Sequence, residues 1–301
     1  MIQPENIPTG QPLAGEPPLS TELLMPSGQL PAAAQQPPFG QIPVAEQLPV
    51  PVIKPRFWGA WATVGLGTAI FTIYSMIQTI VLVVFAVVKA VTEYSSFSQI
   101  DPYKFINSLS TDGLMLSSAI ILGGIIGFGF IILFIKIRRG ISIREYLALK
   151  PISLKTIPVL LGILAALVGI SIGIGLISGG AKTSDPISQA YSTMKWPALF
   201  WIASVVFAPV FEESLFRGFL FAGLKDSKLG IAGTIVLTGL VFALLHAFQY
   251  GVGVIAQIFV LGIVFGVVRW RTRSLFSTIG LHAVWNLLQL LLLTFAAGLG
   301  T

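Results

Sequence analysis

Six long apolar runs dominate the sequence, and each is long enough to cross a lipid bilayer. They cover residues 57–88, 114–135, 157–177, 197–224, 230–268 and 275–299. A membrane-spanning helix needs about 20 apolar residues, each adding ~1.5 Å of rise. The run 230–268 is about twice that length and has a polar turn near 249–253, so it predicts two spans. We therefore expect an all-α, polytopic transmembrane helix bundle of about seven spans.

The content of charged residues excludes an ordinary soluble enzyme. Only 10% of the residues are charged, against about 25% in a typical soluble domain. The chain has no cysteine, which excludes disulfides, cysteine-ligated zinc, iron–sulfur clusters and a thiol nucleophile. It has two histidines, so a site of three histidines cannot form.

The first 53 residues differ from the rest of the chain. They hold 12 of the 19 prolines and no Lys or Arg before Lys54. Proline fixes φ and removes a backbone donor, so this stretch predicts a disordered or polyproline-like tail. We divide the chain into this Pro-rich tail (1–53), three N-terminal transmembrane helices with their loops (54–196), and a core that carries the site (197–299).

The positions of the basic residues predict the orientation. If the N-terminus is cytoplasmic, 13 of the 18 basic residues lie in cytoplasmic segments and four lie outside. This positive-inside bias explains the net charge of +6 without a nucleic-acid partner. We expect an integral protein of a bacterial inner membrane, with its N-terminus in the cytoplasm and its C-terminus outside.

Small residues recur at four-residue spacing in several runs. The pairs are Gly123 and Gly127, Gly169 and Gly173, and Gly262 and Gly266. Small residues on one helix face let helices approach closely in lipid. These pairs predict helix packing and carry no chemistry.

Strongly polar side chains gather in the last third of the chain, where they interrupt three of the apolar runs. The main ones are Glu212, Glu213, Arg217, His246, His282 and Asn286. Ionisable groups inside a membrane are costly and mark functional sites by default. Residues four apart share a helix face, so Glu213 pairs with Arg217, and His282 projects with Asn286. We expect Glu212, His246, His282 and Asn286 to converge, and Pro209 to kink the helix beside Glu212.

Such a cluster supports hydrolysis. A desolvated Glu212 can act as a general base on water, with a histidine to hold that water. A second histidine and the Asn286 amide suit a tetrahedral oxyanion. Alternatively, Glu212, His246 and His282 could bind one divalent metal such as zinc. No H-E-x-x-H, no pair of aspartates in one span and no G-x-S-x-G motif is present.

Three motifs in this region resemble one known family. They are E-E-x-x-x-R at Glu212–Arg217, F-x-x-x-H at Phe242–His246, and H-x-x-x-N at His282–Asn286. In this order they resemble the CPBP family of intramembrane proteases, which includes the CAAX proteases and bacteriocin-processing (Abi) proteins. The resemblance covers roughly residues 197–291. It implies that Glu212 activates water with help from His246, that His282 and Asn286 line an oxyanion site, and that Glu213 and Arg217 support the site.

The function we expect is therefore that of an intramembrane endopeptidase. Its substrate would be a membrane-associated protein or peptide, and prenylated CAAX proteins are among the candidates. The protein would be surrounded by membrane lipid. One alternative is a non-catalytic scaffold or bacteriocin-immunity protein of the same fold. Another is a proton-coupled transporter, but the first three spans hold no counterpart of the polar cluster, as an internal repeat would require. The metal requirement and the oligomeric state stay open.

Overall fold

The computed structural model describes residues 57–177, 186–194, 196–247 and 249–298, so the predicted tail lies outside the described residues. This part of the chain is built from helices and contains no β-strand. The α-helices are α1 (Ala60–Glu93), α2 (Pro102–Ser110), α3 (Gly113–Ile137), α4 (Ile143–Tyr146), α5 (Ile157–Ile177), α6 (Pro186–Ser192), α7 (Pro197–Ile202), α8 (Ala208–Glu213), α9 (Phe221–Leu224), α10 (Gly230–Leu244), α11 (Val252–Thr272) and α12 (Leu275–Gly298). Short 3₁₀ turns lie at η1 (Phe97–Gln99) and η2 (Leu154–Thr156), and π-helices at η3 (Ala203–Phe207) and η4 (Ser214–Leu220).

Six helical segments of the described chain are long and apolar enough to cross a membrane, which confirms the predicted fold class. They are Ala60–Glu93, Gly113–Ile137, Leu154–Gly173, Pro197–Leu224, Val252–Thr272 and Leu275–Phe295. The predicted fifth span is shorter than expected. Helix α10 has 15 residues, or ~22 Å at ~1.5 Å each, which is less than the ~30 Å of a bilayer core. His246 consequently lies in the turn that follows α10 and not inside a span.

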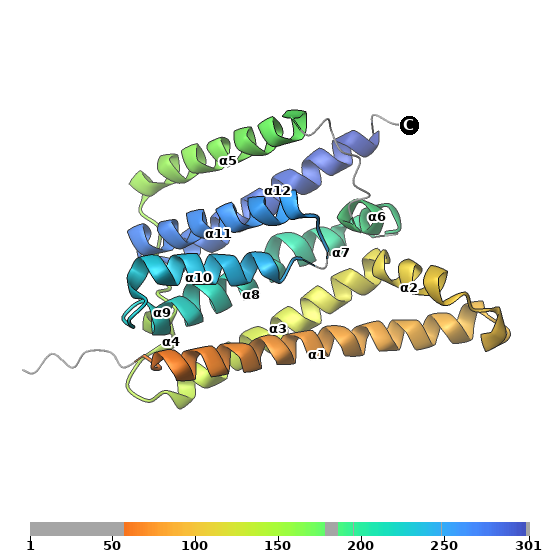
Figure 1. Ribbon diagram of the computed structural model, residues 1–301, viewed down its shortest axis with the longest axis horizontal. Coiled ribbons are helices and arrows are strands. Elements are labelled where there is room, and N and C mark those ends of the chain that lie inside the picture. Colours follow the sequence, from red (N-terminus) through yellow and green to blue (C-terminus); the bar gives the residue numbers. More distant parts are fainter. Residues whose placement is uncertain (1–56, 178–185, 195, 248, 299–301) are drawn as a thin grey trace, which may run out of the picture. The chain divides into compact units, whose positions relative to one another are not determined.

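Helices α1 and α3 pack against each other over much of their length (Figure 1). Trp58 Nε1 donates to the Phe134 carbonyl at 3.1 Å, and Arg138 Nε donates to the Phe57 carbonyl at 3.3 Å. These bonds join the start of α1 to the end of α3, so the two helices run antiparallel.

Some of the predicted glycine pairs lie at close helix–helix contacts and one pair does not. A Cβ at Gly123 would lie 3.0 Å from the Tyr74 ring, and one at Gly262 would lie 2.8 Å from the Gly239 Cα. Both glycines therefore sit at close helix–helix contacts. In contrast, a Cβ at Gly169 or Gly173 would meet nothing within 4 Å. Our packing prediction for that pair was wrong, because no described residue packs closely against these two glycines.

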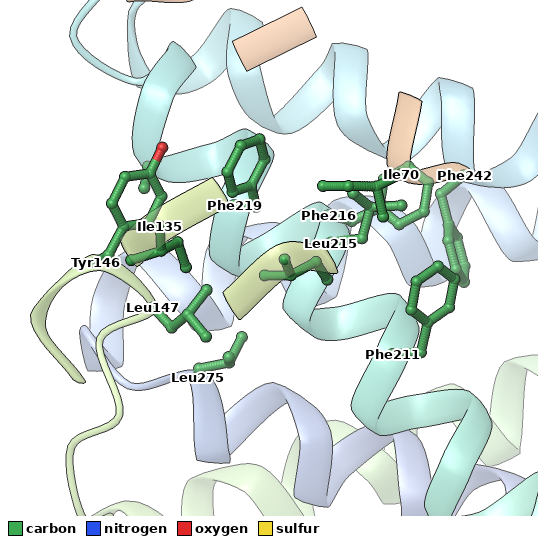
Figure 2. Packing of buried hydrophobic residues seen from close by; sticks show 12 residues of the cluster. Ile70, Ile135, Tyr146, Leu147, Phe211, Leu215, Phe216, Phe219, Phe242 and Leu275 are labelled. Carbon is green, nitrogen blue, oxygen red and sulfur yellow. The ribbon is translucent and has the colours of Figure 1, made fainter. Parts of the chain in front are cut away.

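A continuous span, α7–η3–α8–η4–α9, runs through the centre of the main hydrophobic cluster. Figure 2 shows its aromatic side chains, with Phe211, Phe216 and Phe219 surrounded by residues from other elements. Tyr146 of α4 stacks on Phe219 with ring centroids 5.5 Å apart. The loop after α4 then fixes the start of α12, because the Leu275 amide donates to the Ala148 carbonyl at 3.0 Å. This contact helps to set the position of His282, two turns further along α12.

Candidate active site

The central span departs from α-helical hydrogen bonding just before Glu212. The Ala208 amide donates to the Ala203 carbonyl, five residues back, instead of to Ser204. The next residue, Pro209, has no amide hydrogen to donate. The Ser204 carbonyl thus loses both backbone donors that would normally reach it. The Asn286 side chain from α12 replaces them, with Nδ2 donating to the Ser204 carbonyl at 2.9 Å.

This contact shows how the chain satisfies a carbonyl that Pro209 leaves without a backbone donor. A carbonyl without a donor costs several kcal/mol where no water is present, so breaks in membrane helices are satisfied by neighbouring side chains. The sequence predicted a kink at Pro209, and the local response is the π-helix η3. The hydrogen bond from Asn286 thus joins α12 to the span that carries Glu212.

Arg217 is held inside the second π-helix, η4. Its side chain is buried, and Nη1 donates to Glu213 Oε1 at 3.0 Å while Nη2 donates to the Gly262 carbonyl of α11 at 3.0 Å. The guanidinium also lies 4.7 Å from the centroid of the Phe242 ring. Arg269 of α11 in turn donates from Nε to the Arg217 carbonyl at 3.0 Å. Arg217 therefore joins the central span to α10 and α11.

Glu213 is fully buried and binds two partners through one oxygen. Besides Arg217, its Oε1 accepts from His282 Nδ1 at 3.0 Å. The sequence predicted the Arg217 pair from the spacing of four residues, but it gave no sign of the His282 contact. That contact joins residues 69 apart, and helical spacing identifies neighbours only within one helix.

The Glu213 bond selects a tautomer of His282. A carboxylate only accepts hydrogen bonds, so Nδ1 carries a proton in this contact, and in the neutral form of the ring Nε2 keeps a lone pair. This nitrogen lies 3.9 Å from Glu212 Oε2, which is too long for a direct hydrogen bond. The Glu212 side chain is 20% exposed, whereas that of Glu213 is 0% exposed. With a neutral ring, two acceptor atoms therefore face each other at a separation that one water molecule can bridge.

His246 caps the end of α10. Its amide donates to the Ala243 carbonyl at 3.0 Å, which leaves the Phe242 carbonyl without its usual partner, and His246 Nδ1 donates to that carbonyl at 2.8 Å. The lone pair on its Nε2 stays available by the same tautomer argument. The Phe242 ring lies 5.0 Å from the His246 ring and 6.1 Å from the His282 ring.

The structure brings together four of the six predicted site residues directly. Glu212, Glu213, Arg217 and His282 form one connected group. Asn286 contacts the span of Glu212 through the backbone of Ser204. Within the described chain, no hydrogen bond or ion pair joins His246 to Glu212, and the Phe242 ring connects it to His282 instead.

Glu212, His246 and His282 are the side chains that the sequence offers as metal ligands. In the part of the chain that the structure describes, no group of three or more His, Cys, Asp or Glu side chains could hold a metal ion. The zinc site of Glu212, His246 and His282 that the sequence left open stays a prediction.

Comparison with known protein families finds a match to the region that carries this cluster. Residues 194–288 match the family described as type II CAAX prenyl endopeptidase Rce1-like. The match confirms the resemblance inferred from the motifs, includes all three of them, and covers under a third of the chain. Helices α1 to α6 lie outside it. No curated protein and no solved structure matches the chain.

Proposed function

We propose that the chain is an intramembrane endopeptidase in which Glu212 activates a water molecule for attack on a peptide bond. The observation that carries this proposal is the arrangement of His282 between two carboxylates. Glu213 accepts from Nδ1 at 3.0 Å, and Glu212 faces Nε2 at 3.9 Å. A buried carboxylate that orients a histidine beside a reacting group is a recurring catalytic arrangement.

The proposed reaction begins with one water between Glu212 and His282. The water donates one hydrogen to the Glu212 carboxylate and the other to His282 Nε2. Glu212 takes its proton as the water oxygen attacks the carbonyl carbon, and a tetrahedral oxyanion forms. Glu212 then gives that proton to the departing amine, and the C–N bond breaks. Glu212 ends the cycle as a carboxylate.

This scheme gives His282 and Asn286 different roles. With its Nε2 unprotonated, His282 suits the water better than the oxyanion that the family resemblance implies. Asn286 uses one amide hydrogen on the Ser204 carbonyl, and the second hydrogen of the same amide is the donor that we assign to the oxyanion. His246, with a lone pair on Nε2, assists at the rim of the site.

We assign a membrane-associated peptide or protein as substrate, and a prenylated CAAX peptide is the first probe because of the family match. We further propose that the site opens to the cytoplasm of a bacterial cell. Basic residues of the described chain gather at the bundle end where α1 begins: Lys136, Arg138, Arg139, Arg144, Lys150, Lys155, Lys225, Lys228, Arg269, Arg271 and Arg273. This is the end expected in the cytoplasm.

The proposal is tested by comparing protein termini in membranes of cells that express the wild type or Glu212→Gln at equal levels. Termini found only with the wild type establish a protease and identify its substrates. The purified proteins are then compared on a farnesylated peptide with a fluorophore and quencher across the last three residues. Identical termini, with no cleavage of the peptide by either protein, would favour the scaffold or immunity function instead.

A further inference from the structure

Tyr74, on α1, reaches the site from outside the segment that matches the family. Its ring stacks on Phe211, the residue before Glu212, with centroids 4.2 Å apart and planes 15° apart. On α3, a Cβ at Gly123 would lie 3.0 Å from two of the ring carbons. The absence of that Cβ leaves room for the ring. Tyr74 is therefore held between α3 and α8, next to the proposed base.

The Tyr74 hydroxyl is oriented and keeps its proton free. Gln78, one turn further along α1, donates from Nε2 to the hydroxyl oxygen at 2.8 Å. The hydroxyl proton has no acceptor at hydrogen-bond distance among the described residues. A phenol that accepts one hydrogen bond also becomes a better donor for another.

The water of the proposed reaction lacks one partner that Tyr74 can supply. A water molecule has two hydrogens and two lone pairs. Its hydrogens go to Glu212 and His282, and one lone pair must point at the carbonyl carbon. The remaining lone pair needs a donor. Among the groups next to Glu212, Glu213 and His282 are engaged with each other, and the two terminal nitrogens of Arg217 donate to Glu213 and Gly262. Arg217 Nε is buried and has no hydrogen-bond partner among the described residues.

We propose that the Tyr74 hydroxyl donates to the attacking water and holds it against Glu212, as a further catalytic residue. The inference rests on the proposed function and extends it to α1. Tyr74 keeps its own proton throughout, because the water proton goes to Glu212 and then to the departing amine. Gln78 is the positioning residue that aims the hydroxyl.

The experiment compares Tyr74→Phe with the wild type, as full-length purified protein, on the farnesylated peptide. Phenylalanine keeps the stack on Phe211 and removes only the hydroxyl. We expect kcat to fall roughly 10- to 100-fold with KM within about twofold, as when one donor to a reacting oxygen is lost. The melting temperature should not change. Tyr103→Phe, at an exposed position on α2, is the matched control and should have no effect.

A second variant and a direct observation keep the test independent of folding and of turnover. Gln78→Leu should lower kcat less than Tyr74→Phe does. A structure of the wild type at a resolution that shows waters should place one within about 3 Å of both the Tyr74 hydroxyl and the Glu212 carboxylate, and Tyr74→Phe should lose it.

The outcomes separate this inference from the proposed function. An unchanged kcat in Tyr74→Phe, or a site without that water, overturns the role of Tyr74 while Glu212-dependent cleavage still stands. Cleavage that survives Glu212→Gln overturns the proposed function, and with it the catalytic part of this inference, even if the water is present.

Discussion

The span from Pro197 to Leu224 and helix α5 are opposites within one bundle. The central span is more buried inside the bundle than the segment Leu154–Gly173, which contains most of α5, and it is the less apolar of the two. The central span carries Glu212, Glu213 and Arg217 and contains two π-helices. Helix α5 is uncharged and helical throughout. The less apolar helix is thus the inner one, because lipid can cover α5 but cannot satisfy charges or unpaired carbonyls.

The largest effect that would test this contrast is expected at Glu212. Glu212→Gln removes the proposed base, and we expect cleavage of the farnesylated peptide to fall by at least about 10³-fold. The Glu212 side chain is partly exposed, so the melting temperature should stay close to that of the wild type. Glu93→Gln, at an exposed position of α1, is the control. If Glu212→Gln kept full activity, Glu212 would not be the base, and the contrast between the two helices would not be explained by catalysis.

The next effect concerns the buried ion pair. Arg217→Met leaves Glu213 charged and buried, so we expect a loss of about 3–5 kcal/mol in the free energy of unfolding. Denaturation of the purified protein in mixed micelles measures this loss. The double variant Glu213→Gln/Arg217→Met should recover part of it. Arg139→Met, in the exposed turn after α3, should cause no measurable loss. Equal losses at both arginines would contradict a special role of the buried Glu213–Arg217 pair.

A smaller effect tests the link between Asn286 and Pro209. Asn286→Leu leaves the Ser204 carbonyl without a donor, which should cost about 1–3 kcal/mol of stability. Pro209→Ala restores a backbone amide hydrogen beside that carbonyl, so the same Asn286 change should cost less than half as much in this background. A double-mutant cycle of unfolding free energies gives the coupling. If the two costs are equal, Asn286 does not replace the missing backbone donor.

The smallest effects compare glycines in the two regions. A Cβ at Gly127 of α3 would collide with the Phe211 ring, so Gly127→Ala should cost about 1–3 kcal/mol. Gly169→Ala on α5 adds a Cβ in open space and should change stability by about 0.5 kcal/mol or less, in either direction. Melting temperatures of the two variants in detergent check this difference. A larger loss at Gly169 would mean that another surface covers α5.

Much of the fold was predictable because the residues of a single segment are enough to decide whether it forms a membrane helix. The apolar runs predicted the membrane helices, and the spacing of four residues in Glu213 and Arg217 predicted their pair. Errors arose where the chain departs from regular helix. His246 lies beyond the end of α10 because that helix is short. The π-helix η3, which precedes Pro209, was not predicted by any residue pattern.

The sequence by itself determined that the chain enters a membrane and that its polar groups concentrate in the last third, since both follow from the transfer energies of side chains. Only the tertiary structure decided that His282 binds Glu213, that Asn286 binds the Ser204 carbonyl, and that Tyr74 of α1 stacks beside the proposed base. The physical reason is that each contact joins different helices. Which helices meet depends on close contacts at glycines and on every carbonyl that a neighbour must satisfy, and no local pattern contains that information.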